Sequence, residues 1–221
     1  MSSSREGMLA AIRAANARGG AVAAADVDAA WEALPRAYTR GTALGHEAVL
    51  ELLEDRLRDY DAHVVRSALR DVSSVVGGML AERGKTRMLA APGMDAALLP
   101  EGFEFVIDDG LSAPAIDRFE GVVTESTLAI AETGTIVLQT VKGQGRRALS
   151  LVPDYHLCVV RASDVVATVP EAMDRIAARP SFATTFISGP SATADIEMTR
   201  IKGVHGPRFL DVIVVVDLQA L

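Results

Sequence analysis

The architecture of this chain follows from residues 63–90, HVVRSALRDVSSVVGGMLAERGKTRMLA. An extended apolar run at 63–65 precedes a helical pattern that has an N-cap candidate at Asp71 and stops at Gly84. The apolar residues of that pattern follow the i, i+3, i+4, i+7, i+8 spacing of one helix face: Val72, Val75, Val76, Met79 and Leu80. Residues 86–90 form a second apolar run, which Pro92-Gly93 ends. Strand, helix and strand in this order predict a β–α–β unit.

The flanking sequence extends this unit in both directions. Residues 46–59 carry an apolar helical stripe, and residues 103–107 are another strand candidate. Near the end of the chain, residues 212–216 read VIVVV, a β-branched run typical of a strand that is buried on both faces. We therefore predict an α/β fold with a substantially parallel sheet, and we expect 212–216 to be an interior strand.

The N-terminal part has a different texture. Residues 2–18 carry a weak apolar stripe that predicts a short helix ending at Gly19-Gly20, and residues 19–45 are alanine-rich without a clear period. We expect the chain to divide into 1–45, a helix with an irregular segment, and 46–221, the α/β domain.

Composition excludes several classes of protein. The 221 residues are 49% hydrophobic and 23% charged, which is the balance of a globular chain. Cys158 is the single cysteine, so an intramolecular disulfide and a cysteine-only zinc or iron–sulfur site are excluded, and a reducing cytosol is favoured. The net charge of −7 argues against nucleic-acid binding, and the longest late apolar run is too short to span a membrane. We expect a cytoplasmic protein with no metal and no cofactor of its own.

Four segments carry residues suited to chemistry. Residues 188–197, SGPSATADIE, follow a strand pattern and combine glycine with hydroxyls that suit an anion; the alternative is an ordinary polar turn. Residues 131–136, AETGTI, place Glu132 beside a glycine turn as a base or nucleophile; the alternative is an exposed hairpin. His205 stands between glycines in KGVHGP and suits proton transfer, although a loop histidine often has no such role. Arg146 and Arg147, with Ser150 and His156 downstream, suit a carboxylate or phosphate, or form a solvated basic loop.

We expect residues 132–135, 188–193 and 205–207 to meet at one cleft at the carboxyl ends of the sheet strands. In that cleft His205 is the expected proton donor or acceptor, with Glu132 or Asp195 as its carboxylate partner. Arg147 is the expected anion partner, and the Ser191 and Thr193 hydroxyls orient the ligand. The remaining predicted contacts to substrate or anion are Thr133, Gly134, Thr135, Ser188 and Gly189.

Taken in order, these motifs resemble the LUD domain, and within it the lactate-utilisation protein C branch. The resemblance rests on AETGTI, on RALSLVP with His156, on FISGPSATADIE and on GVHGP, and it covers roughly residues 60–221. It implies a Rossmann-like three-layer sandwich similar to the NagB/RpiA/CoA-transferase superfamily. It also implies a part in bacterial L-lactate oxidation to pyruvate, with iron–sulfur partner proteins. Other LUD proteins carry a cysteine-rich segment, whereas this chain has only Cys158, so the resemblance places the clusters in partners.

Two other functions stay open. One is a free-standing transferase or isomerase by analogy with the superfamily, in which Glu132 is the covalent nucleophile. The other is a non-catalytic assembly protein whose glycines only shape turns.

Overall fold

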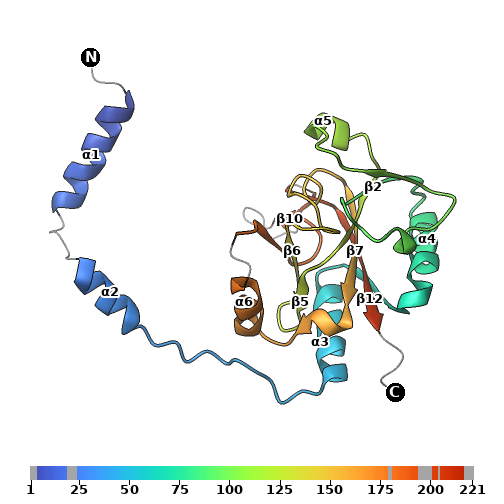
Figure 1. Ribbon diagram of the computed structural model, residues 1–221, viewed down its shortest axis with the longest axis horizontal. Coiled ribbons are helices and arrows are strands. Elements are labelled where there is room, and N and C mark those ends of the chain that lie inside the picture. The colour runs from blue at the N-terminus through green and yellow to red at the C-terminus, as the bar shows by residue number, and fades with distance from the viewer. Residues whose placement is uncertain (1–3, 19–23, 179–180, 194–200, 204, 217–221) are drawn as a thin grey trace. The chain divides into compact units, whose positions relative to one another are not determined.

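Six parallel strands form the main sheet, in the order β1-β12-β7-β4-β2-β3. Figure 1 labels three of them, β2, β7 and β12. The computed structural model describes residues 4–18, 24–178, 181–193, 201–203 and 205–216. The six strands are β1 (His63–Ala68), β2 (Arg87–Ala90), β3 (Glu104–Ile107), β4 (Val122–Glu125), β7 (Tyr155–Arg161) and β12 (Phe209–Val216). Strand β12 lies between β1 and β7, with six successive residues buried, so the prediction of an interior strand over 212–216 is confirmed.

Helices cover both faces of this sheet. Helix α3 (His46–Asp59) and helix α4 (Val72–Glu82) match the helices that the sequence predicts at 46–59 and 71–84. Side chains alternate along β7 and β12, so that Cys158 and Val212 pack with α3, whereas Leu157 and Ile213 pack with α4. The two faces thus bury separate hydrophobic cores, and the predicted three-layer α/β fold is confirmed.

A second sheet lies beside α3 on the same face. Its order is β8-β5-β6-β9, and only the β5–β8 pair is parallel. The strands are β5 (Leu128–Ile130), β6 (Thr135–Gln139), β8 (Val165–Val166) and β9 (Thr184–Ile187). Helix α6 (Val169–Ala177) covers the outer face of this sheet. Short elements complete the unit: η1 (Leu69–Asp71), η2 (Ala96–Leu98), η3 (Ala162–Asp164), α5 (Ala113–Ile116), β10 (Ala192–Thr193) and β11 (Ile201–Lys202).

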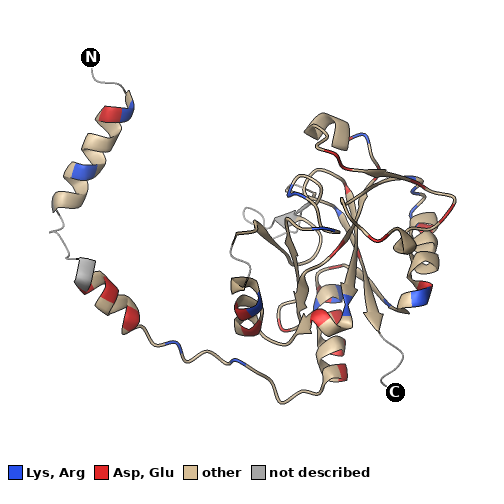
Figure 2. Ribbon diagram, viewed as in Figure 1, with Lys and Arg blue, Asp and Glu red and all other residues tan. Residues whose placement is uncertain are grey.

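The chain divides into two compact units, residues 1–38 and residues 39–221. The first contains α1 (Ser4–Arg18), as the sequence predicts, and also α2 (Ala24–Glu32), which falls in the stretch predicted to be irregular. In residues 39–221, lysines and arginines are spread over several elements and interleaved with acidic residues (Figure 2). None of the helices in the described ranges has the length and apolar character needed to cross a membrane.

Candidate functional site

Hydroxyl groups link the glycine hairpin after β5 to the loop after β9. The Thr133 and Thr135 hydroxyls lie 2.7 Å apart, and the Thr135 hydroxyl lies 2.7 Å from that of Ser188. The contact follows from the sheet, because β6 and β9 pair antiparallel and bring the start of one to the end of the other. Three predicted site residues from two distant segments therefore form one hydrogen-bonded chain.

The third predicted segment joins the same loop through Ser191. The backbone N–H of Ser191 donates to the Pro207 carbonyl over 2.8 Å, and the backbone N–H of His205 donates to the Ser191 hydroxyl over 2.9 Å. Residues 132–135, 188–191 and 205–207 thus lie in one connected cluster, as the sequence predicts. We call this set of residues the hydroxyl cluster.

Two glycines let the hydroxyl cluster pack against the end of α3. Gly134 and Gly189 have φ values of +58° and +81°, in the left-handed region that favours glycine. A Cβ on Gly134 would lie 2.9 Å from the Arg56 backbone carbon, and a Cβ on Gly189 would lie 2.3 Å from the Tyr60 Cβ. Any side chain at either position would displace the loop from the helix.

The hydroxyl cluster borders a small cavity near the start of two main-sheet strands. Ser150, His156, Ser191 and Pro207 line this space of about 20 Å³, which is the room one water molecule needs. Ser150 precedes β7 and Pro207 precedes β12, so the cavity lies at the amino ends of these strands. The prediction that these residues lie at the carboxyl ends of the main-sheet strands is therefore wrong. The reason is that β9, which leads into Ser188, belongs to the second sheet.

His156 is a fully buried histidine beside this cavity. Its Nε2 lies 2.8 Å from the Thr124 hydroxyl on the adjacent strand β4. Burial, with a smaller effect from the Arg147 charge, lowers the pKa of His156 to about 4. The imidazole is therefore neutral at physiological pH and serves as a hydrogen-bonding group.

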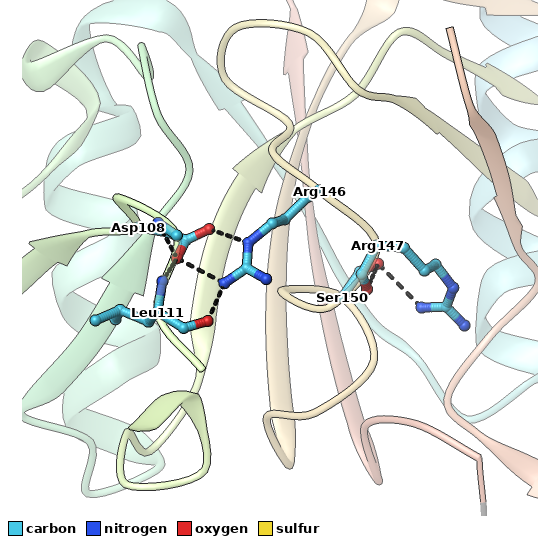
Figure 3. Close-up of polar contacts among 6 residues, drawn as sticks. Asp108, Leu111, Arg146, Arg147 and Ser150 are labelled. Carbon is cyan, nitrogen blue, oxygen red and sulfur yellow. Dashed lines mark hydrogen bonds and ion pairs between the residues drawn. The ribbon is translucent and has the colours of Figure 1, made fainter. Parts of the chain in front are cut away.

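The neighbouring arginines point in different directions (Figure 3). Arg147 is exposed, and its Nη1 donates to the Ser150 hydroxyl over 3.1 Å, so its charge lies near the hydroxyl cluster. Arg146 turns toward Asp108 and donates to both carboxylate oxygens, over 2.7 and 2.9 Å. Of the two, Arg147 is the one that the sequence selects as the anion partner, and its position agrees with contact to the cluster.

The predicted proton-transfer residues are His205 and its carboxylate partner, Glu132 or Asp195. The side chains of Glu132 and His205 are both exposed, and within the described ranges no ion pair joins them. Asp195 lies outside the described residues, and of Thr193 the structure gives only its backbone pairing with Ile201. The roles assigned to these four residues stay predictions.

A larger cavity, of about 500 Å³, opens at the carboxyl ends of the main-sheet strands, opposite the end that carries the hydroxyl cluster. Its walls include Pro92 and Gly93 after β2, Asp108 after β3, and Lys142 and Arg146 from the loop after β6. Asp108 and Lys142 are not among the site residues that the sequence predicts. A signal was present, because Asp108 directly follows the predicted strand at 103–107.

The ionisable side chains offer no metal site in the described ranges, where no three His, Cys, Asp or Glu residues come together in a suitable group. Cys158 is fully buried in β7, and burial raises the pKa of its thiol to about 12. A thiol in that state is a packing group, because the thiolate is the form that binds metals and attacks electrophiles.

Comparison with known proteins gives consistent relatives. The LUD domain matches residues 117–215. Lactate utilization protein C of Deinococcus radiodurans is 42% identical over 83% of this chain and 87% of that protein, and lactate utilization protein C of Bacillus pumilus is 28% identical over 93% of each. The crystal structure of a DUF162 family protein from Deinococcus radiodurans superimposes with a TM-score of 0.69 and 36% identity, over 78% of this chain and 99% of that one.

Proposed function

Because the chain belongs to the LUD domain family, we propose that it serves lactate utilization, as a subunit of a bacterial L-lactate oxidation system that acts with iron–sulfur partner proteins. The observation that carries this proposal is the 42% identity to a lactate utilization protein C, which extends over most of both chains. Similarity at that level and length concerns the whole domain, so it bears on function as well as on fold.

Lactate oxidation needs an electron acceptor, a substrate-binding site and a proton acceptor, and we assign the first to the partner proteins and the other two to this chain. Oxidation of lactate to pyruvate releases two electrons and two protons. In our proposal, clusters in the partners accept the electrons one at a time. This chain binds the small carboxylate through Arg147 and the hydroxyls of the hydroxyl cluster. His205 accepts the proton of the substrate hydroxyl, with Glu132 or Asp195 as its carboxylate partner. The C–H bond at the carbon that bears the hydroxyl breaks: its two electrons pass to the clusters and its proton passes to solvent.

The arrangement around Arg147 supports this role. Its guanidinium is anchored at one end by Ser150, which lines the small cavity with Ser191. A carboxylate next to Arg147 would therefore lie near two hydroxyl groups from different loops, those of Ser150 and Ser191, which line this cavity. Arginine suits this task since its planar guanidinium presents several N–H groups to one carboxylate.

The first experiment is affinity purification of the full chain from its native host, with identification of the proteins that accompany it. Recovery of proteins that contain iron–sulfur clusters supports the proposal. Recovery of the chain alone, together with normal growth on lactate after deletion of its gene, contradicts it.

The second experiment measures lactate-dependent dye reduction by the assembled system. We expect His205→Ala and Arg147→Gln to lower the rate, while the free energy of unfolding falls by no more than about 1 kcal/mol because both side chains are exposed. Arg175→Gln, on the exposed part of α6, is the matched control and leaves the rate unchanged. If all three variants keep full activity, this chain is an assembly protein; an acyl adduct on Glu132 would instead support a transferase.

A further inference from the structure

The cavity of about 500 Å³ lies where the connections of the main sheet diverge. In the order β1-β12-β7-β4-β2-β3, the chain continues from β2 to β3 on one side and from β4 to β7 on the other. The first connection packs on the α4 face and the second on the α3 face. In open parallel sheets such a divergence leaves a crevice outside the carboxyl ends of two adjacent strands, and ligands bind there.

Backbone hydrogen bonds hold the walls of this crevice together. The N–H of Gly143 donates to the Pro92 carbonyl over 2.9 Å, and the N–H of Glu125 donates to the Gly143 carbonyl over 2.7 Å. The loop that contains Lys142 and Arg146 is thereby fixed to the ends of both β2 and β4. The cavity is thus formed by ordered backbone from three neighbouring strands.

Arg146 is held rigidly at the wall of this cavity. Its Nε and Nη2 donate to the Asp108 carboxylate, and Nη2 also donates to the Leu111 carbonyl. Asp108 is itself buried and accepts the N–H groups of Gly110 and Leu111 over 3.1 and 2.9 Å. The ion pair with Arg146, aided by these N–H groups, lowers the pKa of Asp108, so the pair is charged at neutral pH. Within the described part of the chain, Nη1 of Arg146 has no hydrogen-bond partner (Figure 3).

Lys142 supplies a second cation. Its aliphatic stem packs over Gly93, where an added Cβ would lie 3.0 Å from the Lys142 Cγ. Among the residues that the structure places, the Lys142 ammonium has no ion-pair partner. Since Asp108 balances one of the two cations, the side chains that line the cavity carry a net charge of +1, in a chain whose total is −7.

We propose that this cavity is a binding site for a small molecule with an oxyanion group, a carboxylate or a phosphate, which Lys142 and Nη1 of Arg146 contact. The volume of about 500 Å³ is in the range of ligand sites and leaves room for a ligand body against Pro92 and Val141. This site lies at the carboxyl ends of the main-sheet strands, whereas the hydroxyl cluster lies at the amino ends. It does not depend on the proposed function, because a lactate-oxidising subunit and an assembly protein would each retain it.

The test is isothermal titration of the full chain with L-lactate, pyruvate, inorganic phosphate and AMP at constant ionic strength. Lys142→Gln removes one cation without disturbing the buried Asp108–Arg146 pair. Lys85→Gln, near the amino ends of the strands, is the matched control. We expect at least one anion to bind with a Kd below about 1 mM, Lys142→Gln to weaken it about tenfold, and Lys85→Gln to change it less than about twofold.

The four ligands distinguish the source of the oxyanion. Binding of L-lactate or pyruvate with no response to phosphate or AMP identifies a carboxylate site, and the reverse identifies a phosphate site. The proposal is overturned if none of the four binds more tightly than about 10 mM, or if Lys85→Gln weakens binding as much as Lys142→Gln does. Binding that only Arg147→Gln weakens overturns it as well, and supports a ligand in the hydroxyl cluster.

Discussion

Two arginine–aspartate pairs of similar geometry differ in burial, and this difference makes a quantitative prediction. Asp211, near the start of strand β12, is 1% exposed and accepts hydrogen bonds from Nε of Arg83 over 2.7 Å, from Nη2 of Arg83, and from the Tyr155 hydroxyl over 3.0 Å. Arg208 binds both oxygens of Asp154 in the same two-point manner, but the side chains are 56% and 40% exposed. We therefore compare Arg83→Met with Arg208→Met.

The expected losses follow from what each variant leaves behind. Removing one partner of a buried pair strands an uncompensated charge and typically costs 3–5 kcal/mol. The Arg83 side chain is 26% exposed, so water partly reaches the pair, and we take the lower end, about 3 kcal/mol. In a unit of this size that corresponds to a fall in Tm of about 6–12 °C. Arg208→Met leaves a hydrated carboxylate and should cost less than about 1 kcal/mol.

Urea and thermal unfolding followed by far-ultraviolet circular dichroism measure both losses. Tryptophan fluorescence is unsuitable, because the only tryptophan, Trp31, belongs to the unit formed by residues 1–38 and not to the α/β unit. The double variant Arg83→Met/Asp211→Leu removes the stranded charge and should regain most of the stability. Equal losses for Arg83→Met and Arg208→Met, or a double variant as unstable as Arg83→Met, would refute the reasoning.

Three further predictions concern buried groups. The pKa of His156 falls from 6.5 to about 4 on folding, so the unfolded state binds more protons between these values and stability should drop by about 2 kcal/mol from pH 7 to pH 5. His156→Gln should abolish that part of the pH dependence in urea titrations. Gly189→Ala should lower Tm more than Gly102→Ala, because φ is +81° and +86° but only the first Cβ meets a neighbour, Tyr60; equal shifts would show that backbone strain alone matters. Cys158 should react with Ellman's reagent only at the rate of unfolding, and rapid labelling of native protein would contradict its burial.

Local periodicity was sufficient for the elements that pack against the main sheet. Helix α4 buries Val72, Val76, Met79 and Leu80, which are positions of the predicted stripe, because burial selects apolar residues at that spacing. Strand β12 is apolar from Val212 to Val216 because this part of the strand is covered on both faces. Helix α2 has no such signal: its described side chains are exposed, and an alanine-rich segment shows no stripe when no face is buried.

The sequence could not predict which end of the sheet carries the site, because strand order depends on contacts between residues that are far apart in the chain. The sequence shows that Ser188 follows one strand and Asp108 another, but not that β9 lies in the second sheet while β3 lies in the main one. Once the two sheets are known, the rule that ligands bind at the carboxyl ends of parallel strands points to the cavity beside Asp108 and not to the loop that contains Ser188. Arg146 and Arg147 illustrate the same limit within two residues. They look equivalent in sequence, yet one is held by Asp108 at the carboxyl ends and the other reaches Ser150 near the amino ends. If lactate binds at the amino ends of the strands and a second anion binds at the carboxyl ends, Arg147→Gln should affect only the first site and Lys142→Gln only the second. The two variants therefore test the position of each site independently.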